Sequence, residues 1–293
     1  MYYRRKLLLS LLEALNRPVG RTDLQKLLFL VCAEQESPSY EFVPYRFGCF
    51  SFQSMADKSA MTKYRLLADV DHWALAQKKS HASELTANDQ LVVMNVVDQF
   101  GKMSTDQLLR HVYLTYPYYA IHSELLSQTL TGAQRKRVEA AKPLGHSARL
   151  FTIGYEGKTL ENYINCLLRE KVGLLCDVRR NPVSMKFGFN KRQLESALRG
   201  VGIAYAHLPE LGIASNKRRA LVGERNYQAL FLEYERTTLK QNPDALDQII
   251  SMIGNHGRVA LACFEADPTC CHRGRVAHAL ESRPDWRHRV LHI

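Results

Sequence analysis

Residues 259–275, VALACFEADPTCCHRGR, join a short apolar run to a dense set of reactive side chains. The apolar run at 259–262 is typical of a buried parallel strand. Seven reactive residues then fall within eleven positions: Cys263, Glu265, Asp267, Cys270, Cys271, His272 and Arg273. A helical pattern follows from Gly274. Strand, polar loop and helix in this order predict an α/β fold with a ligand site at the carboxyl edge of its sheet.

Three chemical interpretations of this loop compete with a fourth, in which the loop has no function. The first is a metal site built from the residue types that zinc prefers: Cys263, Cys270, Cys271 and His272. Their C-x6-C-C-H spacing is not a standard structural-zinc pattern, so we expect no metal and no other cofactor. The second is a nucleophilic thiolate at Cys271, because His272, Arg273 and a nearby helix start all lower a thiol pKa. The third, which we favour, is a polar cradle in which Glu265, His272 and Arg273 bind or protonate a ligand while the cysteines pack as small hydrophobes.

The composition is that of an ordinary soluble protein with a basic surplus. The 293 residues are 46% hydrophobic and 24% charged, and the net charge is +11. Residues 1–146 hold 18 basic and 14 acidic side chains, a net +4, and residues 147–293 hold 22 and 15, a net +7. This balance favours phosphate-rich partners, and we expect DNA. No apolar run approaches the roughly 18–20 residues of a membrane span, so no membrane partner is expected. The seven scattered cysteines, an odd number, indicate reduced thiols in a cytoplasmic protein.

The first 126 residues are predicted to form a mainly helical domain. Leucine-rich patterns indicate helices at 4–15 and 23–34 with a short turn between them, as in a helix-turn-helix or winged-helix module. The aromatic stretch 40–52 contains Pro44 and Gly48, which argue against a regular central strand and favour a loop or an irregular wing. Further helices are expected at 55–67, 87–100 and 104–113.

Three segments of this half share one family pattern. Residues 23–29, DLQKLLF, are similar to an LQKLLY-like helix, and residues 42–51, FVPYRFGCFS, to an aromatic Y-G-P-F-S turn with Cys49 where proline is usual. Residues 101–117 are similar to a later helix pair. Together they resemble the Panacea-type domain, which also occurs in phage-associated proteins and antitoxins. The resemblance implies a module that binds nucleic acid or a protein partner. Within it Lys26 and Arg46 are candidate phosphate contacts, with ordinary surface cations as the alternative.

A polar, basic linker is predicted at 127–148, followed by an α/β domain over 149–293. A strand at 149–154, a helix at 160–170 and a strand at 173–179 form a βαβ unit, hence a parallel sheet flanked by helices. Polar residues end or follow these strands: Tyr155, Glu156, Asp177, Arg179 and Arg180. Together with Glu265 they give three polar strand ends on one edge of the sheet, which predicts a site there.

The second half also contains an ordered series of short motifs: 151–159, 177–182, 186–191, 205–212, C-x-E at 263–265 and C-H-R at 271–273. With these motifs it resembles the domain-of-unknown-function 488 family over residues 149–293, nearly end to end. The family pattern C-x-E-x(5)-C-H-R aligns Cys271 and leaves Cys270 outside it. The resemblance implies the fold and carries no reaction with it.

The residues expected to act divide by role. Catalysis is assigned to Asp177, Glu265, Cys271 and His272. Substrate binding is assigned to Tyr155, Glu156, Arg179, Arg180, Lys191 and Arg273. Further nucleic-acid contacts are assigned to the basic run Lys217, Arg218 and Arg219. In this scheme Arg179 and Arg273 hold phosphate, and Asp177 or Glu265 acts as general base or electrostatic stabiliser.

These features lead to three functional hypotheses. The first is a DNA-binding and DNA-processing hydrolase, of nuclease or glycosylase type, that acts on a modified or flipped base. The phage-associated resemblance of the first half suggests a role in phage defence by analogy. The second is a non-catalytic DNA-binding regulator or antitoxin-like binder, whose affinity falls as salt rises. The third is a cysteine-dependent enzyme on a small phosphorylated or sulfur-containing substrate, which needs a low-pKa thiol at Cys271.

Overall fold

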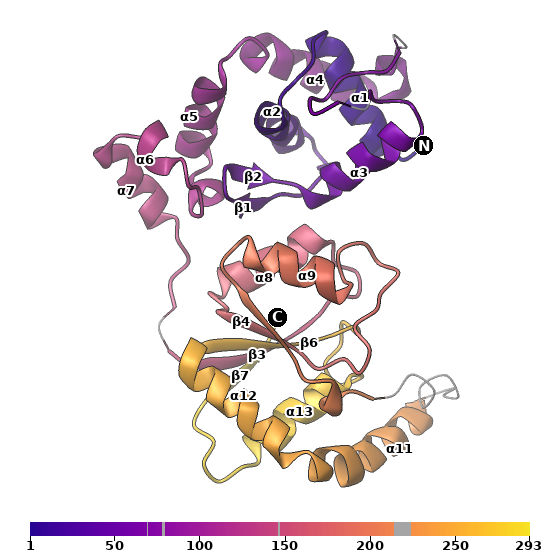
Figure 1. Ribbon diagram of the computed structural model, residues 1–293, viewed down its shortest axis with the longest axis vertical. Helices are drawn as coiled ribbons and strands as arrows, with labels where there is room; N and C mark the ends of the chain where they lie inside the picture. Colours follow the sequence, from indigo (N-terminus) through magenta and orange to yellow (C-terminus); the bar gives the residue numbers. More distant parts are fainter. Residues whose placement is uncertain (69, 78–79, 146, 214–223) are drawn as a thin grey trace. The chain divides into compact units, whose positions relative to one another are not determined.

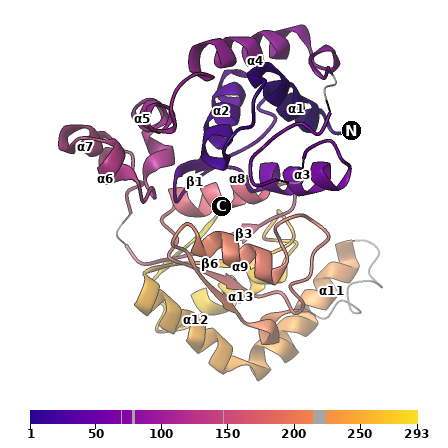
Figure 2. The ribbon, with the colours of Figure 1, turned by 45° about the horizontal axis from the view of Figure 1, so that its top comes forward.

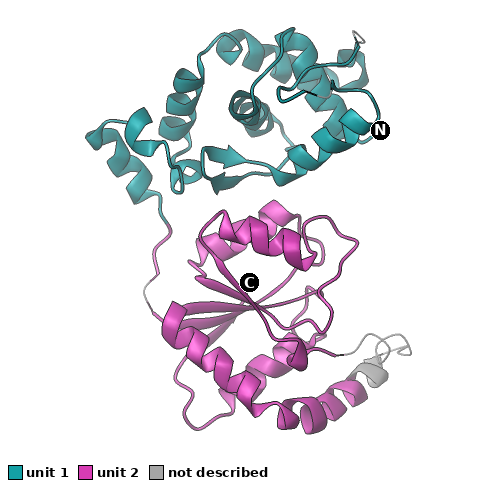
Figure 3. Ribbon diagram, in the orientation of Figure 1, with its two compact units in different colours: residues 1–142 teal, residues 143–293 magenta. Residues whose placement is uncertain are grey.

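The computed structural model describes residues 1–68, 70–77, 80–145, 147–213 and 224–293. The chain forms two compact units, unit 1 over residues 1–142 and unit 2 over residues 143–293 (Figure 3). Among the described residues, none of the helices combines the length and apolar character needed to cross a membrane.

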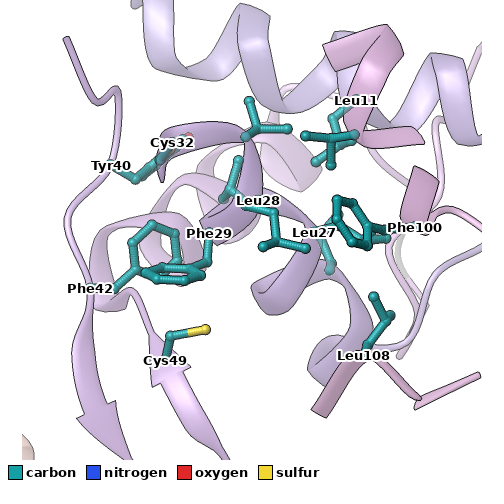
Figure 4. Packing of buried hydrophobic residues seen from close by; sticks show 14 of the residues in the cluster. Leu11, Leu27, Leu28, Phe29, Cys32, Tyr40, Phe42, Cys49, Phe100 and Leu108 are labelled. Carbon is teal, nitrogen blue, oxygen red and sulfur yellow. The ribbon is translucent and has the colours of Figure 1, made fainter. Parts of the chain in front are cut away.

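Unit 1 is mainly helical, as the sequence predicts. Its α-helices are α1 (Tyr3–Leu15), α2 (Arg21–Glu34), α3 (Phe52–Lys63), α4 (Ala87–Phe100), α5 (Thr105–Thr115), α6 (Leu126–Thr129) and α7 (Gly132–Ala140). Helix α2 packs against both α4 and α5, and nine consecutive residues of it, 24–32, are buried. Aromatic and leucine side chains from α2 and its neighbours form the core seen in Figure 4. The apolar pattern therefore places α2 at the centre of this unit.

Helices α6 and α7 occupy much of the segment expected to be a linker. Leu130 and Val138 of this segment are buried in the core of unit 1. The polar composition of 127–148 suggested a connection, but two apolar side chains, Leu130 at the end of α6 and Val138 within α7, are enough to dock it. Unit 1 accordingly extends to residue 142.

Residues 43–50 of the aromatic stretch form a regular hairpin, where a loop or an irregular wing was expected. Strands β1 (Val43–Tyr45) and β2 (Gly48–Phe50) pair antiparallel. Pro44 is tolerated because this sheet has only two strands, each of which is an edge. Gly48 has a φ of +90°, and a Cβ atom there would lie 2.6 Å from the ring of Tyr113. The two residues that argued against a central strand therefore fit a hairpin.

Unit 2 contains a five-stranded parallel sheet, which confirms the predicted α/β fold with a helical region before it. The strands are β3 (Arg149–Gly154), β4 (Leu174–Asp177), β5 (Ala204–His207), β6 (Arg258–Cys263) and β7 (Arg289–His292). Their spatial order is β5-β4-β6-β3-β7, and each neighbouring pair is parallel. Strand β6 is thus the central strand, and all six of its residues are buried.

Helices cover both faces of this sheet. They are α8 (Leu160–Arg169), α9 (Lys191–Arg199), α11 (Glu224–Tyr234), which continues into a π-helical turn (Glu235–Leu239), α12 (Pro243–His256) and α13 (His272–Glu281). Figures 1 and 2 show α8 and α9 on one face and α12 and α13 on the other. The chain leaves β3 and β4 toward the first face and leaves β6 toward the second. Strand β6 therefore lies at a topological switch point, where ligands of open α/β sheets bind.

Candidate functional site at the carboxyl edge of the sheet

The carboxyl ends of three neighbouring strands bring the predicted site residues together. In the sheet register, Gly154 at the end of β3 pairs with Cys263, and Asp177 at the end of β4 pairs with Ala262. The loop that leaves β6 returns to the same edge, because α13 begins at His272 with Cys271 as its N-cap. The C-x-E and C-H-R motifs therefore meet next to the ends of β3 and β4.

Four side chains of this edge form a tight group, which we term the CECH cluster: Cys263, Glu265, Cys271 and His272. The Cys263 Sγ atom lies 3.3 Å from Glu265 Oε2 and 3.4 Å from His272 Nδ1. The Cys271 Sγ atom lies 4.0 Å from His272 Nδ1. One ligand-type atom of each residue lies within 4.8 Å of all the others. Cysteine, glutamate and histidine side chains all bind transition metals, so this cluster could hold an ion.

The C-x6-C-C-H spacing does not describe the residues of this cluster. It included Cys270, which is exposed and lies beside Asp267, with 3.9 Å between Sγ and Oδ2. The loop instead turns Glu265 toward Cys263 and the start of α13. The pattern C-x-E-x(5)-C-H contains all four members, and it was the signal that could have identified the cluster.

Cys271 lies in a poor environment for a free nucleophilic thiolate. Its side chain is fully buried, and burial raises the pKa of its thiol well above the usual value. The neighbouring His272 directs Nε2 to the carbonyl oxygen of Val178, 2.9 Å away. The structure thus gives no support to cysteine-based catalysis by Cys271 in the metal-free protein.

Asp177 forms the centre of a buried ion pair. Its Oδ1 atom accepts from Arg179 Nε at 2.9 Å, and its Oδ2 atom accepts from Arg179 Nη2 at 2.6 Å and from Tyr205 Oη at 2.8 Å. The side chain of Asp177 is fully buried, and burial together with the charge of Asp177 raises the pKa of Tyr205. Because both carboxylate oxygens are occupied, Asp177 acts here as an anchor for Arg179 rather than as an open general base.

The two arginines expected to hold phosphate are internal. Arg179 is 6% exposed and also donates to Tyr155 Oη and to the carbonyl oxygen of Phe189. Arg273 is 1% exposed and donates to the carbonyl oxygens of Glu265 and Ala266. Arginines in these positions support the loops of the site because their donors are directed to backbone oxygens and to Asp177. The sequence reveals charge but not burial, so it could not distinguish the two roles.

Tyr155 and Glu156, at the end of β3, also serve the local structure. The Tyr155 ring is buried and stacks on Phe189 with 4.4 Å between ring centroids. Glu156 accepts a hydrogen bond from the backbone N–H of Ala266 at 2.9 Å. Both residues therefore fix the edge around the CECH cluster.

Exposed cations lie along the ends of β4 and β5. Arg180 is exposed and follows Arg179 directly. Lys191, at the start of α9, is exposed and has its Nζ atom 3.4 Å from Nδ1 of His207. His207 was not among the predicted site residues, although the motif at 205–212 contained it. The predicted contacts Lys217, Arg218 and Arg219 lie outside the described residues.

The two predicted phosphate contacts of unit 1 differ in position. Lys26 is 2% exposed and donates to the carbonyl oxygen of Cys49 at 3.0 Å, and burial lowers its pKa. Arg46 is exposed, with its Nε atom 3.8 Å from Glu124. Both line a pocket of about 320 Å³ beside the β1–β2 hairpin. Lys26 is therefore an interior residue at this pocket, not a cation on an open surface.

Comparison with known proteins supports part of this description. Residues 159–280 match the model of the family described as Domain of unknown function DUF488. This segment contains β4, β5, β6 and the CECH cluster, so the resemblance predicted for the second half is confirmed over these residues. No curated protein and no solved structure matches the chain.

Proposed function

We propose that this chain binds DNA and processes it hydrolytically at the carboxyl edge of the unit 2 sheet. The observation that carries the proposal is the position of Glu265, a half-buried carboxylate beside two buried cysteines and His272 at a topological switch point. A carboxylate at such an edge accepts a proton from an attacking water molecule, the task of a general base in hydrolysis. The family match carries no reaction with it.

The surroundings of Glu265 favour an anionic, nucleotide-like substrate. Unit 2 carries most of the net positive charge of the chain, and Arg180 and Lys191 are exposed near the site. A pocket of about 250 Å³ is lined by Arg180, Tyr234 and the carboxylates Glu210 and Glu233, among others. Tyr234 links this pocket to the cluster, because the centroid of its ring lies 6.0 Å from that of the His272 ring. A base flipped out of a duplex would enter this pocket, with the DNA backbone held by the exposed cations.

In this proposal unit 1 supplies a winged-helix-like contact to DNA. Helix α2 follows α1 after a short turn, and the β1–β2 hairpin takes the place of the wing. Arg46 at the hairpin tip and Arg21 at the start of α2 are exposed and line the same pocket. Such contacts position a protein on DNA and are weakened by salt.

The Glu265→Gln substitution is expected to lower the rate of DNA processing by about 100-fold or more, because it removes the general base. Purified full-length protein is incubated with plain and base-modified duplexes, with and without added zinc, and the products are separated before and after alkali. Direct breaks identify a nuclease, and breaks that appear only after alkali identify base excision.

The matched control is Glu281→Gln, which removes an exposed carboxylate at the end of α13. It is expected to retain the wild-type rate. Equal rates for wild type and Glu265→Gln would remove Glu265 from the mechanism. Salt-sensitive DNA binding without product on any substrate would replace the hydrolase with a non-catalytic binder.

A further inference from the structure

We propose that the CECH cluster is a zinc site in which Cys263, Cys271 and His272 are internal ligands and Glu265 occupies the solvent side. The binding of the ion is argued from geometry alone, whereas the part that Glu265 plays beside the ion rests on the proposed function. Neither the DUF488 description nor the spacing of the cysteines assigns a metal to these residues.

The separations in the cluster are those of atoms around one tetrahedral ion. Zinc bonds of about 2.3 Å to sulfur and about 2.0–2.1 Å to nitrogen or oxygen place neighbouring ligand atoms roughly 3.3–3.8 Å apart. Two of the observed separations, 3.3 Å and 3.4 Å from Cys263 Sγ, already fall in this range. The Cys271 Sγ to His272 Nδ1 separation of 4.0 Å needs a shift of only a few tenths of an ångström. The other separations between the four ligand atoms are at most 4.8 Å, so binding requires the side chains to close by up to about 1 Å.

His272 is oriented as a metal ligand. A backbone carbonyl oxygen can only accept, so the 2.9 Å contact between Nε2 and Val178 O places the ring hydrogen on Nε2. The Nδ1 atom then carries the lone pair that can bind an ion. The Cys263 Sγ atom lies 3.4 Å from Nδ1 and 3.8 Å from Nε2, hence beside the ring, and moves toward the Nδ1 side when both bind one ion. A ring nitrogen that donates to a carbonyl while the other faces the ion is the usual arrangement around metal-bound histidine.

The backbone of the loop is held in place before any ion binds. A Cβ atom at Gly154 would lie 1.8 Å from the carbonyl oxygen of Glu265, and one at Gly274 would lie 2.1 Å from that of Pro268. The two glycines thus let the loop approach the end of β3 and the start of α13 closely. Arg273 donates to the carbonyl oxygens of Glu265 and Ala266 in this loop. A site fixed in this way loses little conformational entropy when it takes up an ion.

The ligand types favour a particular ion, and one coordination position of that ion is accessible to solvent. Two cysteines and an imidazole favour zinc over magnesium or calcium, which prefer oxygen ligands. Both thiols release their protons on binding, so their two negative charges balance the charge of Zn²⁺. Cys263, Cys271 and His272 are buried, whereas Glu265 is half-buried. Three buried ligands and one exchangeable position are typical of catalytic rather than structural zinc sites.

The test measures metal binding directly under reducing conditions. Full-length protein is stripped with chelator and reconstituted with Zn²⁺ or Co²⁺, and bound metal is quantified after gel filtration. We expect one ion per chain, with a thiolate-to-cobalt charge-transfer band and the intense visible bands of four-coordinate Co²⁺. Cys271→Ser is expected to weaken zinc binding by more than about 100-fold, because even changes outside the ligand set cost 10–100-fold. Cys270→Ser, a change at the adjacent exposed cysteine, is the matched control and should bind zinc as the wild type does.

Circular dichroism of each variant shows whether it is folded, and the wild-type cobalt spectrum is informative even where a variant does not fold. Substoichiometric metal in folded wild type, or a cobalt spectrum without the thiolate band, would overturn the zinc site. In that case thiol hydrogen bonds to His272 and Glu265 hold the cluster together. Stoichiometric zinc without DNA processing would retain the site and remove the proposed function. Glu265-dependent processing by folded protein that takes up no zinc would do the reverse.

Discussion

Replacing Asp177 with alanine is expected to lower the free energy of unfolding of unit 2 by about 3–5 kcal/mol. Arg179 is 6% exposed, so the substitution leaves its guanidinium in the protein interior without the carboxylate of Asp177 as a partner. It also removes the acceptor of Tyr205 Oη. The measurement is urea denaturation followed by tryptophan fluorescence in a Trp73→Phe background. Trp286 is then the sole tryptophan of the chain and reports on unit 2.

The matched control for Asp177→Ala is Glu195→Ala. Glu195 accepts from Arg199 at 3.0 Å on the surface of α9, where the Arg199 side chain is 74% exposed and the Glu195 side chain 37% exposed. Loss of such an exposed pair costs about 0.5 kcal/mol or less. Replacing Arg179 with methionine in the Asp177→Ala background should restore part of the stability, because it removes the unpaired charge. Similar effects of Asp177→Ala and Glu195→Ala would mean that the buried pair is not the anchor described here.

This prediction changes how variants of the site must be interpreted. Asp177, Arg179 and Arg273 were all predicted to act on the substrate, and the structure places all three inside the unit. Loss of activity after substitution of Asp177 would follow from loss of structure as readily as from loss of a general base. Glu265 is the better probe of chemistry, because it is half-buried.

The sheet of unit 2 could largely be predicted, because its strands are apolar and short. Strands β3 and β6 match the apolar runs that begin at 149 and 259. Strand β5, with the sequence AYAH, was missed. Its four residues are only half-buried at the edge of the sheet, so its sequence lacks the continuous apolar run of a central strand.

The members of the candidate site could be predicted, but their roles could not. Polar residues at the ends of parallel strands meet at one edge of the sheet whatever their roles. The predicted topology alone was therefore enough to identify the residues near the site. Whether Cys270 or Glu265 belongs to the cluster depends on how the loop after β6 turns. That turn is held by Gly154 and Arg273, whose contacts are formed with residues distant in the sequence or across the loop. Burial of a cation such as Lys26 likewise depends on tertiary packing that the sequence pattern does not reveal.

Replacing Phe29 with alanine is expected to lower the free energy of unfolding of unit 1 by about 3–5 kcal/mol. The Phe29 side chain is 4% exposed, and its ring makes edge contacts with Phe42, Tyr116 and Tyr119 at centroid distances of 5.2, 4.9 and 4.6 Å. Figure 4 shows Phe29 and Phe42 in contact within the core. Alanine leaves a cavity at the point where α2 meets the segment before β1 and the chain after α5. Urea denaturation in a Trp286→Phe background measures the effect, because the fully buried Trp73 then reports on unit 1 alone.

Leu91→Ala on α4 is the matched control, since it also truncates a large apolar side chain but one that is 58% exposed. Its expected effect on the free energy of unfolding is within about 0.5 kcal/mol. Phe29→Leu should lie between the two, because leucine refills part of the cavity while losing the aromatic edge contacts. An effect of Phe29→Ala no larger than that of Leu91→Ala would show that α2 is not the central helix of unit 1. The same Phe29→Ala substitution is also measured in the Trp73→Phe background, where Trp286 reports on unit 2. An unchanged Trp286 transition there, beside a large effect on unit 1, would show that the two units unfold independently.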